Sequence, residues 1–156
     1  MYLHIMKPSA PRLSSQEIPL PCACATLRRA SRAVTQFYNR ALEGSGLEVT
    51  QFTFLQVLAT AGELTQGRMA GLLAIDSTTL SRSLKPLEKA GWIASRAGRD
   101  RRERILRLTA TGRRTLEQAL PWWRGVQEQL RKRLGDAGWN LLMLSADLAT
   151  GASRAG

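Results

Sequence analysis

The sequence predicts a mainly α-helical protein with one small β-hairpin, and three observations support this fold class. Apolar residues recur every three or four positions along most of the chain, as on the buried face of a helix. Glycines and helix-capping residues divide the middle of the chain into three short helical segments. The stretch WIASRAGRDRRERILRLT, residues 92–109, has apolar ends and a charged centre, which is typical of two strands joined by a turn.

The length of 156 residues suits one domain with a real core and short appendages. Four prolines among residues 1–21 disfavour helix and predict an extended N-terminal arm. No apolar run approaches the roughly 18 residues of a membrane span, and MYLHIMKPS lacks the apolar core of a secretion signal. We therefore expect a cytoplasmic protein with no membrane partner.

The first helix is predicted from Ala23 to Glu43, because its apolar residues keep a helical spacing and two glycines follow. Thr50 is expected to cap a second helix that ends at Gly62. Thr65 is expected to cap a third, shorter helix. The second and third of these helices bear core-facing apolar residues, and Met69 of the third is a predicted core residue.

A fourth helix is predicted after Asp76 and Ser77, both of which are capping residues. Apart from its leucine stripe, this helix bears small hydroxyls and cations: Ser77, Thr78, Thr79, Ser81, Arg82, Ser83 and Lys85. Such a face suits a DNA major groove, because short side chains allow close approach while cations reach guanine or phosphate. A helix-turn-helix places its second helix in this way. Pro86 predicts a bend after Lys85.

The charged hairpin follows this helix directly. Six arginines and two acids lie between Arg96 and Arg107, an excess of four positive charges. A ribbon with arginines at its tip fits a minor groove, so the predicted DNA-contacting tip comprises Arg99, Asp100, Arg101 and Arg102. Asp100 is expected to hold a neighbouring arginine in place. The alternative is a solvated hairpin whose charge keeps the protein in solution.

From Thr111 a long helical pattern is expected to kink or break near Pro121, and two later glycines separate a last apolar piece that includes Met143, a predicted core residue. The apolar residues of the first helix and of residues 111–148 exceed what a small domain covers alone. A second copy is the simplest cover, which predicts a homodimer and a pseudo-palindromic operator. Trp122 and Trp123 are assigned to this interface or to an aromatic ligand pocket.

The overall charge points to the same partner. The chain has 23 Lys and Arg against 12 Asp and Glu, a formal net charge of +11, with a pI near 11.2. Nearly all the cations are arginine, which forks two hydrogen bonds onto phosphate or guanine. The composition therefore favours double-stranded DNA as the partner.

The runs LSRSLKPLEKAGWI and DRRERILRLTATGR resemble the MarR family of winged helix-turn-helix regulators, over roughly residues 47–113. The resemblance implies a recognition helix at residues 77–85 and a minor-groove arginine at Arg102, buttressed by Asp100. The opening CACATLRRASRAVTQFYNRAL is similar to a subset of the family with an N-terminal Cys-x-Cys. A repressor released from DNA by a small molecule, soft metal or oxidant is the implied function.

Sequence and resemblance together predict five segments. They are an extended arm (1–21), a dimerisation helix (22–46), a winged helix-turn-helix DNA-binding domain (47–110), C-terminal dimerisation helices (111–150) and a disordered tail (151–156).

Cys22 and Cys24 lie at the predicted start of the first helix, where backbone donors and the helix dipole favour a thiolate. Thiols from two chains meeting there would bind a soft metal or metalloid, or cross-link under oxidation. The alternative is two ordinary buried cysteines. A disulfide within the pair is disfavoured by strain, and no cofactor is required by the sequence.

An enzyme is not expected, because the chain has no Gly-rich phosphate loop and no His-Cys cluster at zinc spacing. Two other functions remain as alternatives to specific regulation. One is a non-specific, basic architectural nucleic-acid-binding protein. The other is a thiol redox protein that uses Cys22 and Cys24.

Overall fold

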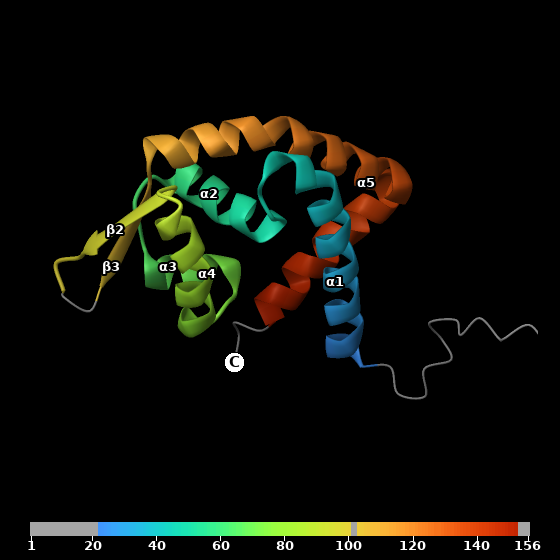
Figure 1. Ribbon diagram of the computed structural model, residues 1–156. Helices are drawn as coiled ribbons and strands as arrows, with labels where there is room; N and C mark the ends of the chain where they lie inside the picture. The colour runs from blue at the N-terminus through green and yellow to red at the C-terminus, as the bar shows by residue number, and fades with distance from the viewer. Residues whose placement is uncertain (1–21, 101–102, 153–156) are drawn as a thin grey trace, which may run out of the picture. The chain divides into compact units, whose positions relative to one another are not determined.

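The computed structural model describes residues 22–100 and 103–152 (Figure 1). The predicted N-terminal arm, the wing-tip residues Arg101 and Arg102, and residues 153–156 of the predicted tail lie outside the described residues. The chain divides between Val34 and Thr35 into two compact units.

Helix α1 (Ala23–Leu42) begins in the first unit and ends in the second. A short 3₁₀ turn (Glu43–Ser45) follows it, and Gly46 then takes a positive φ of 74°. The predicted end at Glu43 is right to within one residue. In the second unit, the buried Tyr38 donates a hydrogen bond from its hydroxyl to Gln127, and burial raises the pKa of Tyr38.

Helix α2 (Val49–Ala61) begins earlier than predicted. Thr50 is already inside its first turn, and the N-cap is Glu48, so the assignment of Thr50 as the cap is wrong. Two other side chains satisfy the free backbone donors there: Gln51 Oε1 accepts from the Glu48 N–H at 3.0 Å, and Asn39 Oδ1 accepts from the Val49 N–H at 2.8 Å. Because these acceptors suffice, no hydroxyl cap is needed.

Helices α3 (Gln66–Leu73) and α4 (Ser77–Lys89) have the predicted caps. Thr65 Oγ1 accepts from the Arg68 N–H at 3.2 Å, and Asp76 Oδ1 accepts from the Thr79 N–H at 2.8 Å. Helix α4 continues without interruption through Pro86, where a bend was expected. Pro86 is exposed, so water can satisfy the helix carbonyl that loses its donor there.

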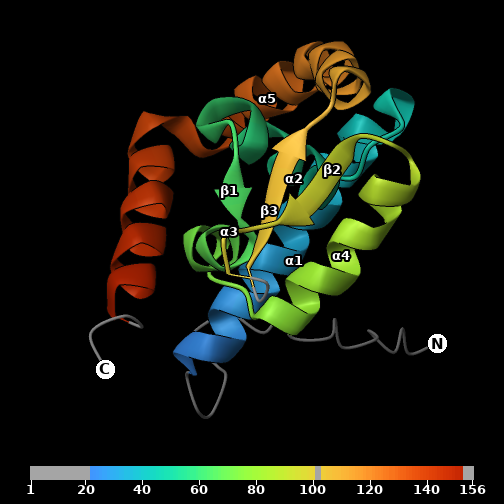
Figure 2. The ribbon, with the colours of Figure 1, turned by 90° about the vertical axis from the view of Figure 1, so that its left-hand side faces the viewer.

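The two predicted strands are present as β2 (Ile93–Ala97) and β3 (Arg104–Leu108), paired antiparallel. A third strand, β1 (Leu64–Thr65), pairs with the other edge of β3, giving the order β1-β3-β2 (Figure 2). The sequence did not predict β1, because two residues are too few to show a strand's alternation of apolar and polar positions.

Helix α5 (Ala110–Ala152) is interrupted at Gly135, whose φ of 66° and ψ of 168° are not helical. The separation predicted at Gly135 is confirmed, whereas the helix continues at Pro121, where a kink or break was also predicted. Pro121 is exposed within a helical stretch, whereas Gly135 adopts a backbone conformation that L-residues avoid. Gly151 and Ala152 still belong to α5, so the predicted tail begins too early.

The core lies among α2, α3, α4 and the sheet, and its fully buried side chains include Phe52, Leu55, Leu58, Met69, Leu80, Leu84, Leu87 and Leu106. Met69 is buried as predicted, but Met143 is 43% exposed in this chain, so its assignment to the core is wrong. Trp123 stacks on Phe52 with ring centroids 5.5 Å apart. It therefore packs against the core of its own chain rather than lying at an interface.

Helix α5 leaves the sheet at a tightly packed junction. The Thr109 hydroxyl donates to the Gly91 carbonyl at 2.6 Å, and Thr109 Oγ1 accepts from the Gly112 N–H at 3.0 Å. A Cβ on Gly112 would lie 2.0 Å from the Trp92 carbonyl oxygen, so only glycine fits. The junction fixes the direction in which α5 departs from the winged domain.

Candidate nucleic-acid interface

Helix α4 presents its polar face outward. Its leucines Leu80, Leu84 and Leu87 are fully buried, while Arg82 and Lys85 on the other side are exposed. The remaining predicted contact residues of this face are also at the surface: Ser77, Thr78 and Thr79 are exposed, and Ser81 is half-buried. The hydroxyl- and cation-bearing face predicted from the sequence is thus available to a ligand.

Thr79 differs from its neighbours, because its hydroxyl donates to Asp76 Oδ2 at 2.5 Å and its N–H donates to Oδ1. Hydrogen bonds from Thr79, the side-chain bond first, lower the pKa of the exposed Asp76 despite a small opposing desolvation. In this structure the Thr79 hydroxyl therefore stabilises the N-terminal cap of α4.

The hairpin of β2 and β3, with the turn between them, is the wing. A hollow of about 500 Å³ lies between the start of α4, the start of α3 and this wing. Its lining residues are Thr65, Gln66, Gly67, Ser77, Ser81, Glu103 and Arg104. A second hollow, along α4, shares Gln66 with the first and also borders Arg82 and Lys85. The sequence reading missed Gln66, although its place directly after the Thr65 cap put it at the tip of α3.

The wing turn is held by its backbone. The Gly98 N–H donates to the Glu103 carbonyl at 2.8 Å, and the Glu103 N–H donates to the Asp100 carbonyl at 2.9 Å. Arg99 and Asp100 are exposed, as a DNA-contacting tip requires. The contact between Asp100 and Arg102 stays a prediction, since Arg102 lies outside the described residues.

Two of the wing arginines form ion pairs with the body of the domain. Arg96 Nη2 lies 2.7 Å from Glu63 Oε2, and Arg104 Nη2 pairs with Glu88 Oε1. The hydrogen bond from Arg96 is the main cause that lowers the pKa of Glu63. Desolvation opposes it to a smaller extent, and the charges of Arg96 and Arg107 lower the pKa further. The excess of four positive charges in the hairpin falls to two when Glu63 and Glu88 are counted, which the sequence alone did not reveal.

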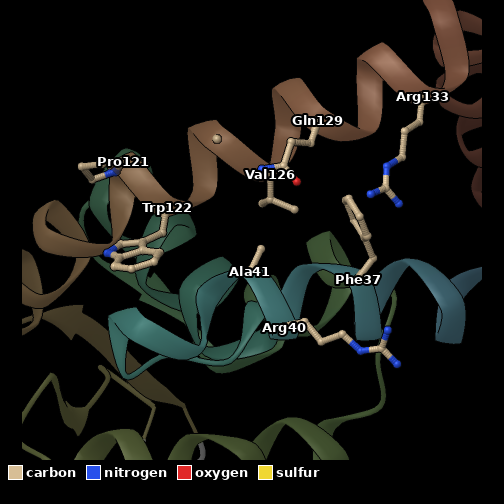
Figure 3. Close-up of a pocket in the computed structure, with 9 residues that line it drawn as sticks. Phe37, Arg40, Ala41, Pro121, Trp122, Val126, Gln129 and Arg133 are labelled. Atoms are coloured by element: carbon tan, nitrogen blue, oxygen red, sulfur yellow. The ribbon is translucent and has the colours of Figure 1, made fainter.

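A pocket of about 680 Å³ lies between the last turns of α1 and the middle of α5 (Figure 3). It has aromatic walls, Phe37 and Trp122, and two cations, Arg40 and Arg133. The Arg133 guanidinium lies 4.7 Å from the Phe37 ring centroid, and Trp122 is 48% exposed. The surroundings fit a planar anion or an aromatic side chain of a partner.

Cys22 and Cys24 are free and exposed at the start of α1, where the Thr26 N–H donates to the Cys22 carbonyl at 3.0 Å. Their predicted position is confirmed, and the alternative of two buried cysteines is wrong for this chain. Within residues 22–100 and 103–152, no three His, Cys, Asp or Glu side chains gather as metal ligands. In the same residues, no helix combines the length and apolar character needed to cross a bilayer.

Known proteins resemble this chain in both sequence and fold. A model described as the MarR family matches residues 45–103. The uncharacterized HTH-type transcriptional regulator YwoH of Bacillus subtilis is 32% identical over 92 residues, which cover 59% of this chain and 67% of YwoH.

Two solved structures have the same fold. The M. tuberculosis transcriptional regulator MosR in complex with DNA is 38% identical, with a TM-score of 0.77 over 86% of this chain and 97% of MosR. A mutant MarR from E. coli, complexed with operator DNA, is 21% identical, with a TM-score of 0.72 over 86% of this chain and 96% of MarR. The predicted fold class and family resemblance are confirmed, while the Cys-x-Cys subset stays a prediction. The chain belongs to the MarR family of winged helix-turn-helix transcriptional regulators.

Proposed function

We propose that this protein is a sequence-specific DNA-binding repressor that acts in the cytoplasm as a homodimer, without a catalytic role. The observation that supports this best is the outward face of α4, where hydroxyls and cations stand beside a cationic wing. MosR and MarR, which share the fold, have been crystallised with DNA.

In this proposal α4 enters the major groove. Ser81 and Arg82 read base edges, and Lys85 binds bases or phosphate. Ser77, Thr78 and Thr79 stand at the N-terminal end of α4, which comes nearest to the bases in a helix-turn-helix. The wing tip, with Arg99, Arg101 and Arg102, enters the neighbouring minor groove.

The homodimer is supported by exposed leucines in α5 beyond Gly135. Leu141 and Leu148 are each 65% exposed, and Leu144 between them is 56% exposed. Their spacing of three and four residues places them on one helix face. A second copy presenting the same face would cover the stripe, and twofold symmetry would pair two α4 helices with a pseudo-palindromic operator.

Release from DNA requires an effector that binds the released geometry better than the bound one. A planar anionic small molecule suits the pocket of Phe37, Trp122, Arg40 and Arg133. An oxidant or a soft metal or metalloid suits the exposed thiols of Cys22 and Cys24.

A competition experiment tests the proposal. The full chain is used to select from a random duplex library, and the enriched duplex is then competed with unrelated DNA. A specific regulator prefers its site by about a thousandfold or more. Equal binding to every duplex would identify an architectural protein instead, and turnover of a dithiol substrate that requires Cys22 and Cys24 would identify a redox protein.

A further inference from the structure

Glu88, Ser95 and Arg104 form a hydrogen-bonded cluster where α4 meets the wing. Glu88 Oε1 accepts from Ser95 Oγ at 2.8 Å and from Arg104 Nη2, and Arg104 Nη2 also donates to Ser95 Oγ at 3.1 Å. Because Glu88 belongs to α4, Ser95 to β2 and Arg104 to β3, one carboxylate joins the reading helix to both strands of the hairpin.

Arg104 extends the same cluster to the other end of α4. Its Nη1 donates to Gln66 Oε1 at 3.3 Å, and Gln66 Nε2 donates to the Ser77 carbonyl at 3.5 Å. The chain of contacts therefore runs from the last turn of α4, across the wing, to the first residue of α4. It also borders the hollow between α4 and the wing, which Arg104 and Gln66 line.

Stability alone is a poor explanation for this cluster. The side chains of Glu88 and Arg104 remain 24% and 35% exposed, and ion pairs near the surface add little to folding stability. The apolar core that includes Leu84 and Leu106 already holds α4 against the sheet. What a planar guanidinium with several fixed acceptors adds is orientation.

A small change in the angle between the wing and α4 moves the tip of the wing by a larger distance than it moves the base. Ser95 lies midway along β2, and the wing tip begins three residues further on, at Gly98. At a strand rise of roughly 3.3 Å per residue, Arg99 lies about 13 Å from Ser95, so a tilt of about 10° moves it by about 2 Å. That displacement is enough to break hydrogen bonds to a groove.

We propose that Glu88 and Arg104 are positioning residues that set the angle between the wing and α4. They thereby fix the distance between the bases that α4 reads and the flanking minor groove that the wing contacts. The inference rests on the proposed function, and it assigns part of the operator's flank specificity to residues that need not touch DNA.

The experiment starts from a duplex selected by the wild-type full chain out of a random library. Binding is measured by fluorescence anisotropy on two probes, the whole selected duplex and a shorter duplex that keeps only the central bases. Glu88→Gln should weaken binding to the whole duplex by about fivefold, because it replaces a charged hydrogen-bond acceptor with a weaker, neutral one. Binding to the short duplex should stay within about twofold of wild type. A repeated selection should return the same centre with a flank no longer at a fixed distance.

Two further variants separate geometry from charge. Glu103→Gln removes one negative charge from the hollow that Arg104 lines but leaves the Glu88–Arg104 pair intact. It should therefore change binding to both duplexes by the same factor. Ser95→Ala removes a neutral partner of Glu88 without a change of charge and should reproduce a smaller version of the Glu88→Gln effect. Melting curves followed by circular dichroism confirm that each variant is folded.

A cycle with the wing tip gives the decisive result. In an Arg99→Ala background, Glu88→Gln should weaken binding to the whole duplex by less than it does in the wild-type chain, because one of the wing contacts that it positions is already lost. Equal losses on both duplexes, or full additivity with Arg99→Ala, would overturn the inference and leave the proposed function standing. A wild-type chain that enriches no sequence would overturn both.

Discussion

Helix α4 and the last part of α5 have the same kind of leucine stripe but opposite surroundings. In α4 the leucines at positions 80, 84 and 87 are fully buried in their own chain, whereas in α5 those at 141, 144 and 148 are more than half exposed. Helical spacing identifies a face that water disfavours, but it does not identify what covers that face. The comparison separates the winged helix-turn-helix domain, which buries its own leucines, from an α5 surface that this chain leaves exposed and where we propose the dimer contact.

The largest effect on stability is expected in the winged helix-turn-helix domain. Leu84→Ala leaves a cavity beneath α4 and should lower the free energy of unfolding by about 2–5 kcal/mol. Chemical denaturation measures the loss, and Leu144→Ala, at an exposed position of the other stripe, is the control. A comparable loss in both variants at low protein concentration would remove the distinction between the two regions.

The junction that joins the regions should be nearly as sensitive. Gly112→Ala places a Cβ against the Trp92 carbonyl, where it has no room, and should cost about 1–3 kcal/mol of stability. Gly125→Ala is the matched control, since a Cβ there meets no atom within 4 Å. Equal melting temperatures for both variants would contradict the packing described at Thr109 and Gly112.

The exposed stripe should govern assembly rather than folding. Leu144→Asp places a charge in the proposed interface and should weaken dimerisation by about tenfold or more, because an apolar contact is replaced by a buried charge. Sedimentation velocity reads the change. Ala146→Asp is the control, because it adds the same charge at an exposed position on the opposite side of the helix from the stripe. If the unsubstituted chain is already monomeric, the proposed homodimer is wrong.

Substitutions in α4 and in the wing should change DNA binding in different ways. Arg82→Ala should cost about 1–3 kcal/mol and relax the preference for one base. Arg102→Ala should weaken binding to all sequences and reduce the logarithmic salt slope by about one unit. Titrations at several salt concentrations on the selected duplex and a mismatched one distinguish them. Identical profiles for the two variants would refute this division of labour.

The smallest effect concerns the cap of α4 and depends on pH. The pKa of Asp76 is lowered below its ordinary value of 3.8 by hydrogen bonds from Thr79. The ionised cap therefore stabilises the fold above pH 3.8, and this contribution is lost as the pH falls through the lower, folded-state pKa. Asp76→Asn keeps an acceptor but removes the charge, so its stability should fall less steeply with acid. Glu117→Gln serves as the charge-matched control, and an unchanged acid slope for Asp76→Asn would contradict the assignment.

Most of the winged helix-turn-helix domain was predictable, because the sequence patterns that indicate its elements are local. The caps Thr65 and Asp76, the buried leucines of α4 and the two strands of the wing all follow from spacing within a few residues. Thr50 was misassigned because its competitor, Asn39, lies ten residues from the Val49 N–H that it accepts from. Whether the predicted DNA-contacting side chains bind DNA stays a prediction, although those within the described residues are at the surface.

The sequence by itself determined the helix periods, the cationic face of α4 and the arginine-rich wing, because these depend on residue type and short-range spacing. Only the tertiary structure decided which arginines are paired, since Arg96 and Glu63 lie 33 positions apart and Arg104 and Glu88 lie 16 apart. It also decided that Trp123 joins the core and that α5 stays helical at Pro121. Such choices depend on which neighbours the fold brings within contact distance, and local propensity does not contain that information.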